Sequence, residues 1–399
     1  MKRVVQFLSA TVLASVVSAS EPPTPPLPES RVKISGFFDV GITVNPGTPQ
    51  DNQNFGRLFD DRANEPLLNQ VGVDVERALV PQAVQFDWGF KVQFMVGSDA
   101  RFTHSLGRFD RTSNATIQPD LTEAYLNLQF PFTSETGLNL KIGKFATLEG
   151  VETVDPRPNF FYSHSYMFNF GVPGTHTGLL GTFHLANWFD LYAGITRGVS
   201  TSVDDNNDRP AFHGGIGFSL LDGQLTALAS THIGAETPGD NEHKRYLNDL
   251  TITAKLSKNL TSITELNYDY DAAADATGYG IAQYFTYSIN DLFSVGVRAE
   301  IWRDADAFYV ASFADNDDAL DGLRGGAVTL DPRTVSGGRT TYGAVTLGLN
   351  IKPPMAKPVA SLVIRPELRF DRALNGTHPF NDSSDRDQFT AGLDVIVSF

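Results

Sequence analysis

The residues best suited to catalysis in this sequence lie together at Ser163, His164 and Ser165. A histidine beside serine hydroxyls brings a base close to a nucleophile, which is the pair a serine hydrolase needs. Neighbouring residues of an extended segment point in opposite directions, so these side chains are not expected to meet. The chain has no G-x-S-x-G motif, and Gly137 to Lys144 lacks the spacing of a Walker loop. We therefore predict no catalytic residues, with a hydrolase left as an alternative.

Metal ligands are the second kind of chemistry to consider. Asp204, Asn206 and Asp208 begin like a calcium loop, but the glycine at the sixth position and the glutamate at the twelfth are missing. Asp315 to Asp318 form another acidic run in a long loop. The 8 histidines include no pair two to four residues apart, and the chain has 0 cysteines. Solvated acidic loop tips are the simpler interpretation, and we predict no metal site and no cofactor.

The composition narrows the class of protein that must carry these residues. The chain has 399 residues and a net charge of -15, which disfavours nucleic acid as a partner because phosphates need a basic face. After the first twenty residues, no apolar run is long enough for a transmembrane helix. The mean hydropathy of -0.17 fits a soluble β-protein and a membrane barrel equally well.

The N-terminus begins to separate these two classes. Lys2 and Arg3 precede an apolar stretch, Val4 to Val17, which ends in small residues at Val17-Ser18-Ala19. This pattern is typical of a secretory signal, although a buried helix is the alternative. We predict a signal peptide over 1–19, a Pro-rich periplasmic spacer over 20–30 and the folded protein over 31–399.

Beyond residue 31 the dominant pattern is alternation of apolar and polar residues, as from Val84 to Val96. This period of two predicts strands with one apolar and one wet face. About sixteen such segments occur, long enough for tilted membrane strands. Pro366 interrupts one of them, so we expect a bulge or a different boundary there. The predicted strands span 31–45, 66–79, 82–98, 120–132, 136–148, 174–186, 187–198, 210–221, 223–235, 246–258, 259–271, 276–289, 291–307, 338–351, 359–371 and 387–399.

Short turns alternate with long polar loops along these strands, for example Leu221–Gly223 against 46–65 and 149–173. An even strand number with one short-turned rim and one long-looped rim is typical of bacterial outer-membrane barrels. Closure also pairs the edge N–H and C=O groups that lipid cannot satisfy. The sequence therefore predicts an all-β fold, a transmembrane antiparallel β-barrel. A soluble sandwich would give similar alternation and is the alternative.

Two sets of residues are candidates for a pore. Charged residues that alternate with apolar ones should face a wet lumen, because a charge in lipid costs a few kcal/mol. The predicted pore lining is Lys33, Asp87, Lys91, Lys141, Arg298, Glu300, Arg365, Glu367 and Arg369. The third long loop is densely aromatic and would be a sticky patch if exposed, so we expect it to fold inward and narrow the pore. The predicted constriction is Phe160, Phe161, Tyr162, His164, Tyr166 and Phe168. A structural plug, or aromatic residues packed under neighbouring loops, is the alternative.

Three stretches of the chain carry a resemblance to a known family: 143–152, 159–166 and 173–178. They resemble the central signature of the β-barrel porin-2, OmpL-like family of Gram-negative outer-membrane proteins. Residues 68–70 and 88–92 are similar to its early strands. The resemblance implies a porin-like pore and transfers no defined substrate. Ala146 and Val151 stand where the family pattern has Asp and Tyr, which leaves the local loop contacts open.

Together these patterns predict an outer-membrane porin for passive diffusion of small hydrophilic solutes or ions. A structural or surface-interaction barrel with a closed lumen is the alternative. Expected partners are outer-membrane lipid, lipopolysaccharide, small hydrophilic solutes and a second copy in a homo-oligomer. The acidic loops could share divalent cations with the lipopolysaccharide. The C-terminal Phe399, preceded by alternating apolar residues, resembles the signal read by the barrel-assembly machinery.

Overall fold

The computed structural model describes residues 31–80, 85–111, 115–310, 322–325 and 339–399. The predicted signal peptide, the spacer and the acidic run Asp315–Asp318 lie outside these described residues. The strands are β1 (Val32–Val44), β2 (Pro66–Arg77), β3 (Asp87–Gly97), β4 (Gln118–Pro131), β5 (Gly137–Ala146), β6 (Thr175–Ala186), β7 (Phe189–Val199), β8 (Ala211–Leu220), β9 (Leu225–Gly234), β10 (Arg245–Lys255), β11 (Leu260–Asp271), β12 (Ala276–Ser288), β13 (Phe293–Asp304), β14 (Thr340–Ile351), β15 (Ser361–Ala373) and β16 (Asp387–Ser398). Short helical turns are η1 (Asp99–Phe102), η2 (Met167–Gly171) and η3 (Leu221–Gly223).

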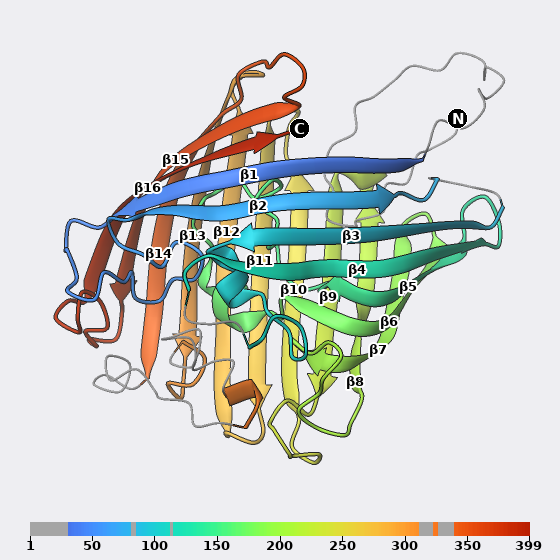
Figure 1. Ribbon diagram of the computed structural model, residues 1–399, viewed down its shortest axis with the longest axis horizontal. Coiled ribbons are helices and arrows are strands. Elements are labelled where there is room, and N and C mark those ends of the chain that lie inside the picture. Colours follow the sequence, from blue (N-terminus) through green and yellow to red (C-terminus); the bar gives the residue numbers. More distant parts are fainter. Residues whose placement is uncertain (1–30, 81–84, 112–114, 311–321, 326–338) are drawn as a thin grey trace.

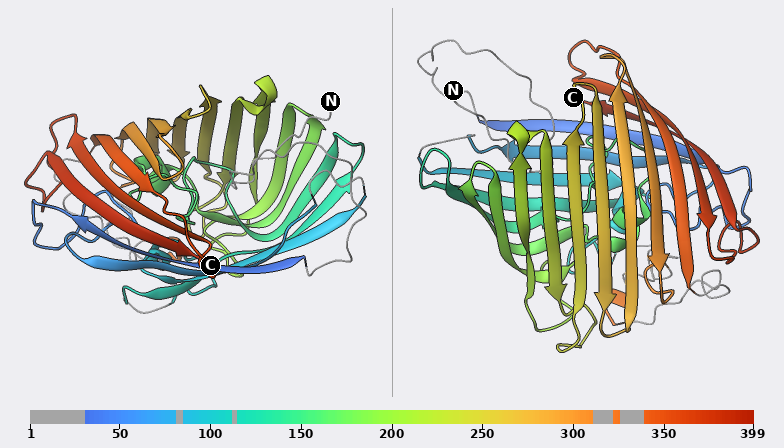
Figure 2. Two further views of the ribbon diagram at one scale, coloured as in Figure 1. Left: turned by 90° about the horizontal axis from the view of Figure 1, so that it is seen from above. Right: turned by 180° about the vertical axis from the view of Figure 1, so that it is seen from behind.

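The strands form one closed barrel in which each pairs antiparallel with its neighbours in the chain (Figures 1 and 2). The barrel closes between β1 and β16, whose paired residues run from Phe37 and Ser398 to Val44 and Ala391. Gly36 and Phe399 extend this ladder with two backbone hydrogen bonds of 3.0 and 2.9 Å. Closure leaves no open sheet edge in the wall, which is the condition for a sheet to be stable in lipid.

The strand prediction is confirmed, because each predicted segment overlaps one of the sixteen observed strands. The expectation at Pro366 was wrong. β15 runs through this residue, which pairs with Leu393 of β16. On the β14 side the same register holds at Glu367 and Ile364, with the ladder interrupted between them. Pro366 therefore interrupts the pairing with β14 locally, but it causes neither a bulge nor the end of the strand.

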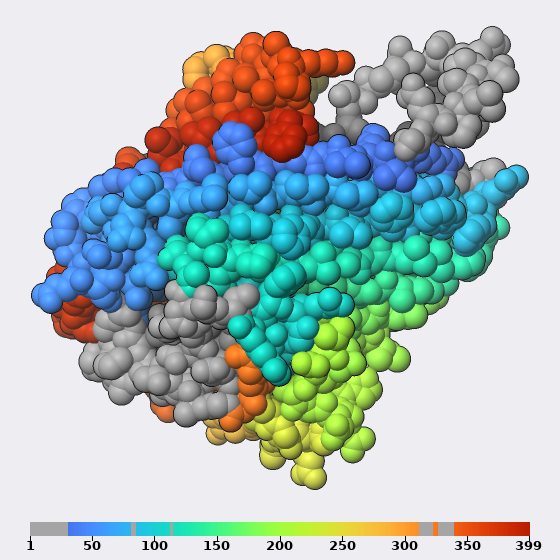
Figure 3. Space-filling model, in the orientation of Figure 1, coloured from blue at the N-terminus to red at the C-terminus, as the bar shows by residue number. Residues whose placement is uncertain are grey.

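The outer face of the barrel is apolar and carries aromatic residues near both rims. Figure 3 shows the outer side of β1 to β4, where Val71, Val73, Val92 and Phe94 are 37–41% exposed. Two girdles of this kind are typical of a membrane barrel. Exposed aromatics near the short-turn rim are Trp88, Phe130, Trp188, Phe285, Tyr287 and Phe399, and those near the long-loop rim are Phe212, Tyr246, Tyr268, Tyr279 and Phe389.

The main apolar core lies at one side of the barrel and is not formed by the wall alone. Residues of the loop after β1 and the loop after β5 pack there against inward-facing residues of β12 to β15. Phe55, Phe161 and Tyr166 from the loops meet Trp302 and Tyr342 from the wall in this cluster.

In the described part of the chain, no helix has the length and apolarity needed to cross a bilayer.

Candidate functional site

Segment 147–174, which joins β5 to β6, bonds to strands that are not its neighbours in the chain. Its backbone N–H groups donate to carboxylates that project from β10, β11, β13 and β15. These bonds are Gly150 to Asp249 Oδ1 at 3.1 Å, Val151 to Glu265 Oε1 at 3.3 Å, Tyr166 to Glu300 Oε2 at 2.6 Å and Tyr162 to Glu367 Oε2 at 2.9 Å. The carboxylates thus satisfy backbone donors that have no helix or strand partner.

Three arginines of the wall satisfy the carbonyl groups of the same segment. Arg298 on β13 donates from Nη1 to the Ser163 carbonyl at 2.8 Å. On β15, Arg365 and Arg369 donate to the carbonyls of Asn159 at 2.7 Å and His164 at 2.5 Å. Hydrogen bonds with one charged partner are stronger than neutral ones, so these contacts hold an irregular segment in one conformation.

Glycines in the wall provide room for the aromatic rings of segment 147–174. A Cβ atom on Gly41 of β1 would lie 2.5 Å from the Tyr162 ring. A Cβ atom on Gly296 of β13 would lie 2.4 Å from the Phe160 ring, and one on Gly348 of β14 would lie 2.8 Å from the Phe161 ring. Larger residues at these positions would displace the rings, so the wall sequence is adapted to the aromatic run.

The structure brings the predicted constriction residues together and packs them against the inner face of the wall. Phe161 and Tyr166 belong to the buried core, against which Phe160 and Phe168 pack. The Tyr166 ring stacks on Tyr342 at 4.9 Å. Tyr162 and His164 are also buried, with 3% and 5% of their surface exposed.

The predicted lining residues fall into two groups. Arg298, Glu300, Arg365, Glu367 and Arg369 are 0–5% exposed and contact segment 147–174, where a wet face was expected. The other four, Lys33, Asp87, Lys91 and Lys141, lie on β1, β3 and β5, whereas the first group lies on β13 and β15. Lys33 is exposed, and Asp87 pairs with Arg31 and Arg77, each at 3.0 Å. Lys91 pairs with Glu123, and Lys141 lies 5.0 Å from the centre of the Tyr125 ring.

The predicted polar loop 46–65 lies within segment 45–65, which joins β1 to β2 and supplies buried contacts that its overall polarity does not indicate. Phe55, Leu58 and Phe59 are each 4% exposed and belong to the core beside Tyr166. Arg57 forms buried ion pairs with Asp371 at 2.5 Å and Asp60 at 2.6 Å. The three large apolar residues Phe55, Leu58 and Phe59 inside a polar loop were the signal that could have identified this contact.

The side chains of the possible hydrolase motif have separate partners. Ser163 Oγ accepts a hydrogen bond of 3.1 Å from Arg298. His164 Nε2 lies 3.2 Å from Asn159 Nδ2, and its ring stacks on Phe168 at 4.3 Å. Burial lowers the pKa of His164 from 6.5 to about 4, which makes it a poor base near neutral pH.

The acidic loop tip at 204–208 is organised by its own backbone. Asp205 Oδ1 accepts the N–H groups of Asn206 at 2.8 Å and Asn207 at 3.3 Å. Such turns use the carboxylate as a local cap. The structure instead brings together three histidines that the sequence spacing did not connect, His176, His213 and His232.

Comparison with known proteins addresses the family and the fold. The family model described as Putative beta-barrel porin-2, OmpL-like matches residues 31–399. No curated protein matches the chain. Among solved structures, the high-pH form of Pseudomonas putida OprB is 12% identical with a TM-score of 0.56, covering 92% of this chain and 94% of that one.

Two further solved structures share the fold. The outer membrane channel DcaP of Acinetobacter baumannii is 12% identical with a TM-score of 0.54, covering 92% of this chain and 97% of that one. The trimer form of OmpT from Vibrio cholerae is 12% identical with a TM-score of 0.52, covering 92% and 99%. At this identity the likeness concerns the barrel fold alone. The family match covers the whole barrel, and the chain therefore belongs to the Putative beta-barrel porin-2, OmpL-like family.

Proposed function

We propose that this protein is an outer-membrane porin of a Gram-negative bacterium that conducts small hydrophilic solutes or ions passively, without catalysis. The observation that carries the proposal is a closed sixteen-stranded barrel with an apolar outer face and charged residues on its inner face. Membership of a porin family supports the same function. Charges inside a lipid-embedded barrel are stable only beside water or paired with other polar groups.

In this proposal segment 147–174 narrows the lumen from the side of β10 to β15. The hydrogen bonds of this segment to Asp249, Glu265, Glu300 and Glu367 support that placement. The remaining water path then runs along β3 to β5, where the Lys91 side chain keeps 21% of its surface exposed. Arg298 and Arg369, with fully covered side chains, would act as anchors of the segment and not as contacts for the solute.

A closed structural barrel is the second candidate, and one observation favours it. Segments 45–65 and 147–174 pack together in one buried core, as a plug would do. Porin and plug differ in whether a continuous water path remains beside that core.

Single-channel conductance separates the two functions. The purified protein is compared with a variant in which residues 159–169 are replaced by a Gly/Ser linker of equal length. The backbone ladders between neighbouring strands do not involve these residues, so the barrel should still close. A porin should conduct before the change and conduct more afterwards. A wild-type protein without conductance would support the plug, and an unchanged value in the folded variant would place the segment outside the path.

The partners follow from the same proposal. The outer aromatic girdles fit contact with outer-membrane lipid and lipopolysaccharide. We also propose a homo-oligomer, because the similar barrel OmpT has been solved in a trimer form. Chemical cross-linking in membranes would detect it. Phe399, which closes the ladder with Gly36, is the proposed contact for the assembly machinery.

A further inference from the structure

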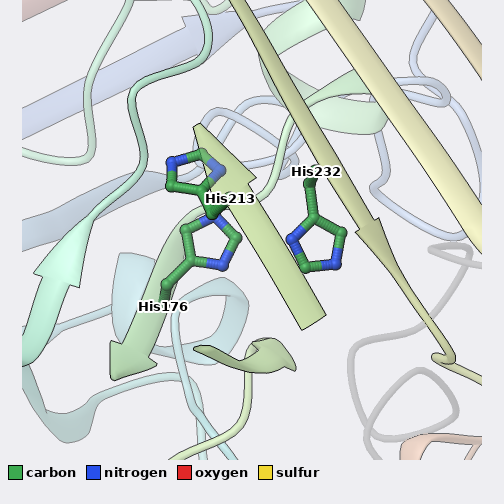
Figure 4. Close-up of side chains that lie close together, drawn as sticks. All are labelled: His176, His213 and His232. Carbon is green, nitrogen blue, oxygen red and sulfur yellow. The ribbon is translucent and has the colours of Figure 1, made fainter. Parts of the chain in front are cut away.

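Three buried histidines from three strands meet on the inner side of the wall near the long-loop rim. His176 lies at the start of β6, His213 at the start of β8 and His232 near the end of β9 (Figure 4). Each is 0% exposed. One ring nitrogen from each lies within 4.8 Å of the nitrogens offered by the other two. The sequence gives no hint of this cluster, because the barrel register alone brings the residues together.

The strand between β6 and β8 makes room for the rings. Two strand spacings separate β6 from β8, about 10 Å. The ring centres of His176 and His213 are nevertheless only 4.1 Å apart. The intervening positions of β7 that share their face are Gly194, Thr196 and Gly198, none of which carries a bulky side chain. His213 and His232 are direct partners in the β8–β9 register.

Hydrogen bonds leave one nitrogen with a lone pair on two of the rings. His232 Nε2 lies 2.7 Å from Glu236 Oε1 and donates to this carboxylate. Its Nδ1 atom is buried and has no hydrogen-bond partner among the described residues. His176 Nδ1 donates to the Gly198 carbonyl at 3.2 Å, so its Nε2 atom has a lone pair, which accepts from the Thr147 hydroxyl at 3.3 Å and which a metal ion would take over. A carboxylate that holds the far nitrogen of a histidine is typical of metal ligands.

A buried carboxylate lies beside the third ring. Glu149 is 2% exposed, and its Oε1 atom lies 3.8 Å from His213 Nδ1. Neither oxygen of Glu149 has a hydrogen-bond partner among the residues that the structure describes. Burial of a polar group without such a partner is costly. A cation between the rings and this carboxylate would remove the cost.

We propose that His176, His213 and His232 bind one divalent transition-metal ion of the zinc class, with Glu149 as the fourth ligand and Glu236 orienting His232. Imidazole nitrogens suit zinc, copper and nickel, whereas calcium and magnesium require oxygen ligands. In a tetrahedral zinc site the ligand atoms lie about 3.3 Å apart, since Zn–N bonds are about 2.0 Å. The three nitrogens now lie within 4.8 Å of one another and Glu149 Oε1 lies 3.8 Å from His213 Nδ1, so the side chains must move closer together when the ion binds. The inference is independent of whether the barrel conducts.

Metal binding would also change the start of segment 147–174. His213 Nε2 now accepts the Leu148 N–H at 3.1 Å. A neutral imidazole has a single lone pair, so a metal on either nitrogen of His213 ends this hydrogen bond. The site therefore couples the ion to the backbone next to Thr147 and Glu149.

Metal binding is tested on the folded full chain, purified with a tag that contains no histidine. Co²⁺ is titrated and followed by visible absorption, and Zn²⁺ is used in competition. Wild-type protein should bind one equivalent with the strong bands of tetrahedral Co²⁺. His213→Gln and His176→Gln should abolish these bands, and Glu236→Gln should weaken the affinity by about 10–100-fold.

Matched controls keep the result specific. His184→Gln changes another β6 histidine, which pairs with Asp190 at 2.8 Å near the other rim, and His243→Gln changes an exposed one. Both controls should bind the metal as wild type does, and circular dichroism should show that every variant remains folded. Absence of stoichiometric binding to the folded wild type, or equal binding by His213→Gln, would overturn the proposal.

Discussion

Arg298 of β13 and Glu152 of segment 147–174 form a buried ion pair, with 2.5 Å between Nη1 and Oε1. The same guanidinium donates to the carbonyl and the hydroxyl of Ser163. One wall residue thus holds the segment at two points. Replacing a buried pair by apolar residues can be neutral, whereas removing one partner leaves an uncompensated charge that costs about 3–5 kcal/mol.

We predict that Arg298→Met releases segment 147–174 from the wall. The loss concerns both the ion pair and the bonds to Ser163, so the aromatic run should become accessible to protease. Chymotrypsin cleavage within 160–170 measures this release, and conductance should rise at the same time. Arg298→Met combined with Glu152→Gln should be less damaging than the two single effects together, because the buried charge is also removed.

Arg372→Met is the matched control for this prediction. Arg372 is on β15 and pairs with Asp387 at 3.1 Å, but the two side chains are 45% and 41% exposed. Exposed pairs contribute about 0–1 kcal/mol, so this variant should resist chymotrypsin as wild type does. Equal protection of Arg298→Met would show that the pair does not anchor the segment.

Cysteine labelling offers a second prediction about the water path along β3. Lys91 faces the interior, and the next residue, Val92, is 38% exposed on the outer face. Lys91→Cys should react with a small anionic thiol reagent, and its conductance should then fall. Val92→Cys should stay unreactive in a lipid bilayer because its side chain faces the hydrocarbon. The chain has 0 native cysteines, so no background reaction interferes. Reaction only at position 92 would reverse the assigned faces.

The wall of the barrel was predictable because every strand repeats the same local rule. Alternation with period two located the strands, and the asymmetry of the loops indicated a barrel with two different rims. The bulge expected at Pro366 from the local sequence is absent, because β15 keeps its register with β16 through this residue. Pairing with β16 is continuous through Pro366, and pairs are missing only on the β14 side.

The interior was less predictable because its contacts join residues that are distant in sequence. Glu152 and Arg298 meet only because a loop reaches strands on another part of the barrel. His176, His213 and His232 depend on strand register and on small residues of β7. Arg57 and Asp371 pair through a loop that composition alone describes as polar. Loop conformation and tertiary register, which decide these contacts, have no periodic signature.

A third prediction concerns the space that Gly41 leaves for Tyr162. Gly41→Val should displace the ring and weaken the hydrogen bond of 3.3 Å from Tyr162 to Asn69. Overpacking of this kind typically costs about 1–3 kcal/mol, which thermal unfolding in detergent would detect. Tyr162→Ala in the same chain should recover part of the loss. Gly174→Ala is the control, because a Cβ there meets nothing within 4 Å. A loss in Gly41→Val that Tyr162→Ala does not reduce would argue against the fit.

The last prediction concerns pH and His164. Its ring lies between Phe59 and Phe168, with ring centres at 4.7 and 4.3 Å. Burial lowers its pKa to about 4, with the Glu152 and Asp60 carboxylates opposing this shift and Arg298 reinforcing it. A released segment would expose the ring, whose pKa would return towards its ordinary value of 6.5.

Because the packed state binds the proton less readily than the released state, packing of segment 147–174 should weaken as the pH falls from 6.5 towards 4. The loss reaches at most about 3–4 kcal/mol, at about 1.4 kcal/mol for each unit of the difference in pKa. Above pH 6.5 both states hold a neutral ring, so packing should not depend on this residue. Chymotrypsin sensitivity of the segment and conductance should therefore rise together between pH 6.5 and 4.5 in the wild type. His164→Phe keeps an aromatic ring that cannot titrate and should lose this response. An identical pH response in His164→Phe would assign the effect to other groups.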